Sequence, residues 1–390
     1  MRSILIKVIA GVSAVLGGGL AVEGATLAEW QRTGSSFDFR LGCEPSATYL
    51  IQQSTNLMTW QTIVRSGSGS SNRLLQIPAS TGAPANLFFR ALRTNEPLFG
   101  FALTARRGID LFGNDLSVDS FDSTNPAYST NGRWDIAKRR DHGDVASGDI
   151  ITNNLGVGSV EIFGRLHIGP VGMTDIGPNG KVGSLAWHFN GNAHGIQPGY
   201  ITDDTNLEFP DAILPATSWG AMPSGGTVNG TNYDYIFSQP GNYRLPAGAG
   251  ALAGKILVWG VDVRLRVDTD INLTGDDRIE LVRTVSTNVF NAPSLTLYMN
   301  GTNAHFGGGG VPPPGGPAFV YFGSEHNISL MIDAQGEVGG AFYAPFADVA
   351  IGGGTNYTDF SGAVVGNSIQ LQGHLSLHFD ESLLRTGPKN

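Results

Sequence analysis

Cysteine and charged residues are scarce in this chain. Cys43 is the one cysteine among 390 residues, which excludes an intramolecular disulfide scaffold and leaves stability to burial and stacking. Charged residues make up 15% of the sequence, against roughly a quarter in ordinary globular proteins. Lysine and arginine total 24 and aspartate and glutamate 33, so the formal net charge is −9. Because a nucleic-acid partner requires clustered cations, we expect none, and an anionic membrane surface is disfavoured for the same reason.

Long apolar runs are also missing. The main one covers residues 8–22, contains a run of three glycines and is too short for a good spanning helix. Arg2 and Lys7 precede it and small residues follow, an arrangement typical of a secretory signal peptide. We predict that residues 1–25 are a signal peptide, with a retained N-terminal anchor as the alternative. The mature protein is then secreted, or resides in the periplasm or cell envelope, without a membrane span.

Motifs for catalysis and cofactor binding are absent as well. The sequence has no Gly-x-Ser-x-Gly nucleophile elbow, no phosphate loop ending in Gly-Lys-Ser/Thr and no cysteine and histidine spacing typical of zinc. The glycine run at residues 307–310 lacks a following lysine, so it does not predict a nucleotide loop. We therefore predict no cofactor and no metal ion.

Glycine, in contrast, is abundant, with 55 Gly and 20 Pro, while 41% hydrophobic residues suffice for a core. In the last fifth of the chain, apolar and polar residues alternate in short runs bounded by glycine, proline or asparagine. The runs cover residues 338–345, 347–353, 362–366 and 369–377. Period-2 alternation of this kind predicts half-buried β-strands.

These runs repeat with a period near 20 residues. Gly340-Ala-Phe returns as Gly362-Ala-Val 22 residues later, and Val349-Ala-Ile returns as Ile369-Gln-Leu 20 residues later. Short strands at such a period predict the stacked coils of a β-solenoid.

A strand-glycine-strand unit also occurs twice. Residues 160–168 and 369–377 are both apolar at positions 1, 3, 7 and 9, with glycine at position 5. We predict that the two copies build both ends of one solenoid and that their apolar residues point inward. These residues are Val160, Ile162, Leu166, Ile168, Ile369, Leu371, Leu375 and Leu377. Residues 173–246, which are less regular and contain seven prolines, are expected to be an excursion from it.

The N-terminal part has strand patterns at roughly 8–12-residue intervals, typical of a small β-sandwich. They cover residues 37–41, 48–53, 60–64, 74–77 and 87–92. The predicted fold is therefore all-β: a small sandwich module over residues 36–93, followed by a β-helix domain over residues 97–385 with a C-terminal cap.

The predicted sandwich carries a Tyr-x-(Ile/Val)-Gln-x-Ser-Thr-(Asn/Asp)-Leu-x-x-Trp motif and a closing Phe-Phe-Arg. The matching positions are Tyr49, Ile51, Gln52, Ser54, Thr55, Asn56, Leu57, Trp60 and residues 88–90. In these motifs the segment resembles a module of secreted proteins from Verrucomicrobia and Planctomycetes. The resemblance implies a fibronectin-like β-module that spaces or binds rather than catalyses.

Three further motifs lie near the C-terminus. They are Phe-Tyr-Ala-Pro-Phe-Ala-Asp-Val at 342–349, Gly-Ala-Val-Val-Gly-Asn-Ser-Ile at 362–369 and His-Phe-Asp-Glu-Ser-Leu at 378–383. With Ser-Val-Asp-Ser-Phe-Asp at 117–122, they make the chain similar to an uncharacterised β-helical domain family of bacterial secreted and envelope proteins. Bactofilins and domains near pilus-assembly proteins share this architecture. The resemblance implies a right-handed parallel β-helix with a structural or surface role. No activity is established for the family, so none is carried over.

Paired carboxylates are the main candidates for catalysis. Asp268 and Asp270 are two residues apart in a strand-like segment, which places them on one face about 6.6 Å apart. Such a separation suits the paired carboxylates of glycoside hydrolysis, and a groove lined by Trp259 and Tyr298 would complete a carbohydrate-active site. The alternatives are a polar turn, in which these side chains satisfy backbone groups, or calcium capture by the same oxygens.

Polar residues alternate with apolar ones at the end of the chain. They are His374, Ser376, His378 and Asp380. We predict that they share a solvated outer face, and that the two histidines, about 13 Å apart along a strand, do not share a zinc ion. Residues 380–384 predict an N-capped turn over the open last coil. Residues 138–144 predict a solvated turn, with a pairing of His142 with Asp141 or Asp144 as the alternative.

These observations favour a non-catalytic, secreted bacterial structural or surface interaction protein that presents a β-helix surface. A polysaccharide or another envelope component is the expected partner. The alternative is a carbohydrate-active β-helix enzyme, a polysaccharide lyase or glycosidase, that uses Asp268 and Asp270. The sequence leaves the oligomeric state open.

Overall fold

The chain is described by a computed structural model. It describes residues 5–8, 26–33, 36–42, 48–55, 61–66, 72–78, 86–94, 97–113, 115–152, 160–169, 172–191, 193–203, 205, 207, 209–212, 214–286, 289–311, 318–352 and 357–388. Contacts divide the chain into two units, one within residues 1–98 together with 208–213, the other comprising 99–207 and 214–388. Among the described residues, no helix has the length and apolar character needed to cross a membrane.

The first unit contains two small sheets, ordered β1-β7-β4-β5 and β2-β3-β6. Their strands are β1 Leu5–Val8, β2 Thr26–Thr33, β3 Ser36–Gly42, β4 Thr48–Ser54, β5 Gln61–Ser66, β6 Asn72–Pro78 and β7 Asn86–Thr94. All five strands predicted between residues 36 and 93 are present, as β3 to β7. Ile51 on β4 and Phe89 on β7 are fully buried.

β1 lies inside the segment predicted to be a signal peptide and pairs in parallel with β7. The other positions of that segment lie outside the described residues, as does Trp60. Removal of residues 1–25 therefore stays a prediction.

The second unit is dominated by a parallel sheet of 22 strands. Its strands are β8 Leu103–Ala105, β9 Gly108–Leu111, β10 Leu116–Phe121, β11 Val145–Ser147, β12 Ile150–Thr152, β13 Val160–Phe163, β14 Leu166–Ile168, β15 Met173–Asp175, β16 Lys181–Gly183, β17 Gly195–Ile196, β18 Ile201–Thr202, β19 Gly220–Ala221, β23 Gly241–Leu245, β25 Asp262–Val267, β26 Ile271–Leu273, β30 Ser294–Met299, β31 Asn303–Phe306, β32 Phe319–Gly323, β33 Ser329–Ile332, β34 Gly336–Ile351, β35 Tyr357–Leu371 and β36 His374–Asp380.

Smaller elements accompany this sheet. They are the strands β20 Gly226–Val228, β21 Thr231–Tyr233, β22 Tyr235–Phe237, β24 Lys255–Trp259, β27 Arg278–Val282, β28 Thr284–Ser286 and β29 Val289–Asn291, the 3-10 helix η1 Ile136–Lys138, and the helices α1 Leu185–His188 and α2 Leu383–Thr386. β22, β24 and β27 form a separate parallel sheet.

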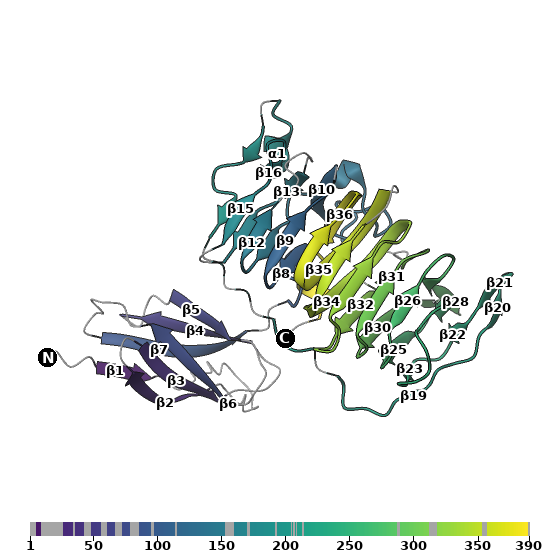
Figure 1. Ribbon diagram of the computed structural model, residues 1–390, viewed down its shortest axis with the longest axis horizontal. Helices are drawn as coiled ribbons and strands as arrows, with labels where there is room; N and C mark the ends of the chain where they lie inside the picture. Colours follow the sequence, from purple (N-terminus) through teal and green to yellow (C-terminus); the bar gives the residue numbers. More distant parts are fainter. Residues whose placement is uncertain are drawn as a thin grey trace. The chain divides into compact units, whose positions relative to one another are not determined.

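The 22 strands stack as a ladder of three rows (Figure 1). Row one runs β18-β14-β11-β8-β35-β34-β32-β30-β25-β23-β19. Row two runs β15-β12-β9-β35-β34-β33-β31-β26. Row three runs β17-β16-β13-β10-β36-β35-β34. The long strands β34 and β35 pass through all three rows.

The chain enters this ladder in the middle. β8 and β9 pair with β35 on one side and with β11 and β12 on the other. From there the chain builds outward to β18, re-enters at the opposite end with β19, and returns to the middle with β34, β35 and β36. The last strand therefore lies beside β10, and in Figure 1 the yellow C-terminal strands adjoin the blue ones.

The predicted repeat is confirmed by the pairing of β34 with β35. Gly340 pairs with Gly362 and Val349 with Ile369, and the irregularity between Ala344 and Asp348 accounts for the change of period from 22 to 20 residues. A Cβ atom at Gly362 would collide with the carbonyl oxygen of Gly340. Glycine is therefore required where the two backbones approach.

The inward orientation predicted for the two strand-glycine-strand units is confirmed, since all eight apolar residues are at most 1% exposed. Their predicted placement at both ends of the stack is wrong. β13 and β36 are separated by one strand, β10, so that Ile162, Val118 and Leu377 form one column. The repeat predicts which residues face the core. It does not predict the order in which the strands pair.

The predicted excursion over residues 173–246 is also wrong in part, because β15 to β19 and β23 belong to the ladder. Several of these strands have only two or three residues, and all seven prolines of the segment lie between strands. Strands this short leave no period-2 signal in the sequence.

Candidate functional site

A buried ion pair lies where the two distant segments of the chain meet. Asp119 on β10 is paired in register with His378 on β36. His378 Nδ1 lies 2.6 Å from Asp119 Oδ1, and the side chains are 1% and 0% exposed. Buried charges are tolerated when they are paired and hydrogen-bonded, so this contact joins the last strand to the first part of the ladder.

Three more side chains enclose His378 and Asp119. Asp359 Oδ1 lies 3.2 Å from His378 Nε2, Arg139 Nε lies 4.0 Å from Asp119 Oδ2, and the Trp134 ring stacks on the imidazole at 3.8 Å between centroids. Burial by itself lowers the pKa of His378, but hydrogen bonds and attraction from Asp119 and Asp359 outweigh it and raise the pKa to about 9. The imidazole is thus charged at neutral pH.

Glu381, directly after β36, forms a second set of contacts with the segment that follows β10. Its oxygens lie 3.0 Å from Arg140 Nη1 and 3.1 Å from His142 Nδ1, and the Ser120 hydroxyl donates to it at 2.8 Å. The hydrogen bond to Glu381 is the main reason that the pKa of His142 is raised. Glu381 therefore holds residues 120–142 against the end of the chain.

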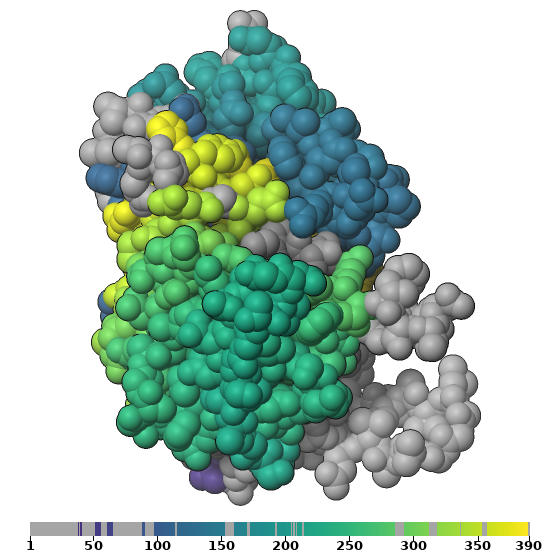
Figure 2. Space-filling model, turned by 90° about the vertical axis from the view of Figure 1, so that its right-hand side faces the viewer, coloured from purple at the N-terminus to yellow at the C-terminus, as the bar shows by residue number. Residues whose placement is uncertain are grey.

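Further contacts extend this connection. Arg385 Nη2 donates to Asp122 Oδ2 at 2.6 Å, and Asp380 accepts hydrogen bonds from the backbone N–H groups of Ser123 and Ser382. Figure 2 shows the blue segment that follows β10 next to the yellow C-terminal strands. The cluster therefore joins the end of the chain to the segment that follows β10.

This cluster corrects the prediction of a solvated polar face on β36. Of the four polar residues only His374 is exposed, whereas Ser376, His378 and Asp380 are 6%, 1% and 3% exposed. The reason is that residues 122–144 cover the outer side of β36, as the stacking of Trp134 on His378 shows.

The expected cap over an open last coil is also wrong, because β36 is paired on both sides, by β35 and β10. The predicted helical turn is present as α2, with Leu383 buried and Leu384 exposed. The Ser382 side chain makes no capping bond to this helix and contacts the Ser123 hydroxyl instead.

The turn predicted over residues 138–144 contains half-buried charges rather than a solvated face. His142 forms its ion pair with Glu381. Asp141 accepts the backbone N–H of Leu185, and Asp144 lies 3.3 Å from His167 Nε2.

Asp268, the first catalytic candidate, is surrounded by positive charge. Arg244 Nε and Arg266 Nε lie 2.5 and 2.7 Å from its carboxylate, and Asn300 Nδ2 donates to it at 3.1 Å. Burial opposes ionisation, but the hydrogen bonds from Arg266 and Arg244 outweigh it and lower the pKa of Asp268. A carboxylate held in this way is a poor proton acceptor.

Asp270, the second candidate, has different partners. It accepts the backbone N–H groups of Thr302 and Asn303 at 3.0 and 2.9 Å, and the Asn303 hydrogen bond is the main reason that its pKa is lowered. These contacts match the polar-turn alternative.

The aromatic residues of the predicted groove, Trp259 and Tyr298, lie on β24 and β30, which are not neighbouring strands. A catalytic role for the two aspartates stays a prediction.

Within the described ranges, no group of three or more His, Cys, Asp or Glu side chains is arranged to hold a metal ion.

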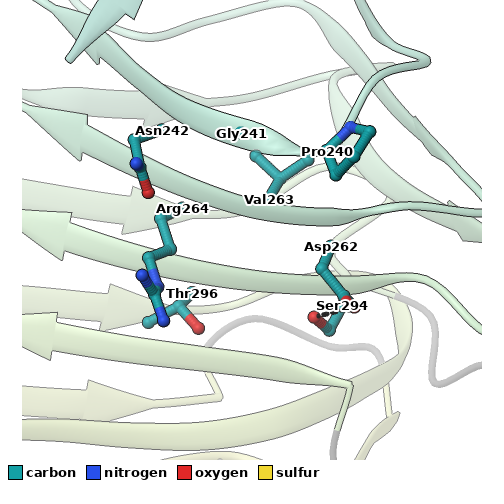
Figure 3. A pocket seen from close by; sticks show the side chains of 8 residues that line it. All are labelled: Pro240, Gly241, Asn242, Asp262, Val263, Arg264, Ser294 and Thr296. Atoms are coloured by element: carbon teal, nitrogen blue, oxygen red, sulfur yellow. Dashed lines mark hydrogen bonds between the residues drawn. The ribbon is translucent and has the colours of Figure 1, made fainter. Parts of the chain in front are cut away.

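A pocket of about 550 Å³ opens on the outer side of row one, across β23, β25 and β30 (Figure 3). Pro240, Gly241, Asn242, Asp262, Val263, Arg264, Ser294 and Thr296 line it. We call it the Arg264 pocket. Asn242, Arg264 and Thr296 form one line across the three strands, and Asp262 and Ser294 form the next. The Ser294 hydroxyl donates to Asp262 Oδ1 at 2.7 Å.

The sequence reasoning missed this pocket, although one signal for it was present. Residues 256–267 predict a long strand, and alternation within it places Asp262, Arg264 and Arg266 on the same outer face. The partners from β23 and β30 could not be found in this way, because their positions depend on the register between strands.

A comparison with known protein families finds a match over part of the chain. Residues 258–386 match the model of a domain of unknown function (DUF7305). The matched range begins within β24 and ends with α2. No curated protein matches the chain.

One solved structure similar to the chain is the competence-associated pilin ComZ from Thermus thermophilus. The alignment has a TM-score of 0.26 and 11% sequence identity, and it covers 92% of this chain and 78% of that one.

Proposed function

We propose that this protein is a secreted or envelope-associated bacterial structural protein. In this proposal the second unit is a right-handed parallel β-helix whose outer face binds a polysaccharide or another envelope component without cleaving it. The N-terminal module acts as a spacer or as a binding module.

The observation that carries the proposal is the uninterrupted parallel ladder. Row one alone joins eleven strands, from β18 to β19, into a continuous outer face. Such a face presents side chains at regular intervals, which suits a partner that is itself a repeating polymer. The internal ion pairs at the junction of β10 and β36 stabilise this face and use no external ligand.

The existing partners of Asp268 and Asp270 further support a protein that binds a polysaccharide over one that cleaves it. Asp268 balances two arginines and Asp270 supports a turn, so neither carboxylate is held ready for acid or base chemistry. The rival proposal, a lyase or glycosidase, requires these carboxylates to act together on a substrate.

A polysaccharide panel tests the proposal. The mature protein is incubated with plant, algal and bacterial polysaccharides, and binding is measured by co-sedimentation and cleavage by reducing ends and unsaturated products. We expect binding to at least one acidic or neutral polymer without cleavage products, and unchanged binding in Asp270→Asn. Turnover that disappears in Asp268→Asn and Asp270→Asn, with circular dichroism unchanged, would overturn the proposal in favour of the enzyme.

A further inference from the structure

Arg264 differs from the arginines beside it. Arg244 and Arg266, on the neighbouring line of row one, both pair with Asp268. Within the described part of the chain, Arg264 has no ion pair and no hydrogen bond, and it is exposed. Figure 3 shows its guanidinium reaching toward Thr296 inside the pocket. The pocket therefore offers one uncompensated cation.

Three other polar side chains of the pocket, Asn242, Asp262 and Ser294, are held by hydrogen bonds. The Asn242 amide donates to Thr217 Oγ1 at 3.1 Å, and Asp262 accepts the Ser294 hydroxyl at 2.7 Å. In Figure 3, Asp262 and Ser294 lie at the opposite end of the pocket from Arg264. A ligand that fits both ends needs one anionic group and, about 7 Å away along the strand, hydroxyl groups that donate to a carboxylate.

Aromatic rings adjoin the pocket. Tyr298 follows Thr296 by two residues on β30, stacks on Phe322 at 5.4 Å and meets the edge of Trp219 at 6.1 Å between centroids. Burial raises the pKa of Tyr298, and the charge of Arg264 partly offsets this. The negative face of an aromatic ring attracts the C–H face of a sugar ring.

We infer that the Arg264 pocket binds a carboxylate-bearing sugar, a uronic-acid unit of an acidic polysaccharide. Arg264 pairs with the sugar carboxylate, Asp262, Ser294 and Thr296 bond its hydroxyl groups, and Tyr298 with Trp219 supports a neighbouring sugar ring. The inference rests on the proposed function and names the class of polymer that the ladder binds.

The chemistry of the pocket favours a carboxylate over other anions. The planar guanidinium matches a carboxylate through two parallel hydrogen bonds. A phosphate would bring more negative charge close to Asp262, and a nucleic acid would meet a chain of net charge −9 at a pocket that offers it one arginine. A neutral sugar would leave Arg264 without its partner.

The test uses an oligogalacturonide and a neutral galacto-oligosaccharide of the same length, titrated calorimetrically into the full-length mature protein. We expect the acidic ligand to bind more tightly. Arg264→Gln should weaken its affinity about ten- to a hundredfold, because a charge-assisted pair is lost, and Arg264→Lys should weaken it less. Arg107→Gln, which removes an exposed arginine between β8 and β9, should leave the affinity unchanged.

The outcomes separate this inference from the proposed function. Equal binding of both ligands, or an affinity that does not respond to Arg264→Gln, overturns the inference while polysaccharide binding stands. Tighter binding of inorganic phosphate than of the oligogalacturonide also overturns it. Absence of binding to any polymer of the panel overturns both.

Discussion

At the scale of single residues, His378 has the largest predicted effect on stability. Replacing His378 by alanine leaves Asp119 as a buried charge without its main partner, which typically costs about 3–5 kcal/mol. His374→Ala is the matched control on the same strand, since His374 and its partner Asp115 are 45% and 74% exposed, and such pairs contribute less than about 1 kcal/mol. Urea unfolding at pH 7 measures both. Equal losses would contradict a structural role for the buried pair.

The same residue predicts a pH dependence. The pKa of His378 is raised from 6.5 to about 9 in the folded protein, so the folded state holds this proton more tightly than the unfolded chain. The resulting stabilisation, up to about 3 kcal/mol, is fully present below pH 6.5 and is lost as the pH rises through 9.

Urea unfolding of the unchanged protein and of His378→Asn, compared between pH 6 and 9.5, measures this effect. The difference between their free energies of unfolding should shrink as the pH rises. A difference that is constant over this range would show that Asp119 and Asp359 do not raise the pKa of the His378 imidazole.

The sequence identified both members of this pair without joining them. Asp119 and His378 each lie in a motif that resembles the β-helical family, yet they are 259 positions apart. The alternation of apolar and polar residues shows only that these two side chains point away from the core. Whether another segment covers that outward side depends on residues 122–144, whose charges look solvated in the sequence alone.

At the scale of elements, the inward column of β35 predicts a contrast between neighbours. Leu371 is 1% exposed, whereas Gln370 points outward and bonds the Gln372 side chain. Leu371→Ala should lower the free energy of unfolding by about 2–5 kcal/mol, as for other buried large-to-small changes, and Gln370→Ala should change it by less than about 0.5 kcal/mol. Denaturant unfolding measures both, and similar small losses would reject this register.

Elements of different length differed in how well the sequence predicted them. β34, β35 and β36 contain the alternating runs predicted at residues 338–377, although the structure joins the first two runs in β34 and divides the last between β35 and β36. The register between β34 and β35 could be read from the repeat. β15 to β19 have two or three residues each. Contacts with the neighbouring strands, rather than the local sequence pattern, determine how they pair. The Arg264 pocket depends on three strands in register and was missed for the same reason.

At the scale of the whole molecule, the fold of the second unit is closed by its last strand. The chain starts in the middle of the ladder, and β36 must reach β10 before Val118, Asp119 and Ser120 are covered. The sequence could not predict this order, because any strand can pair with any other that shows the same inward column. Local pattern therefore predicts the strands and leaves the path of the chain undetermined.

The second unit depends on the pairing of β10 with β36, and engineered cysteines test this pairing directly. Ser117 and Ser376 are partners in register, with their Oγ atoms 3.3 Å apart, within reach of a disulfide. In a Cys43→Ser background, Ser117→Cys with Ser376→Cys should form an intramolecular disulfide, seen on non-reducing gels and by mass spectrometry. Ser117→Cys with Gln370→Cys should stay reduced, because Gln370 lies in row two beside Asp110. Free thiols in the first pair of the native protein, or a disulfide in the second, would contradict the ladder described here.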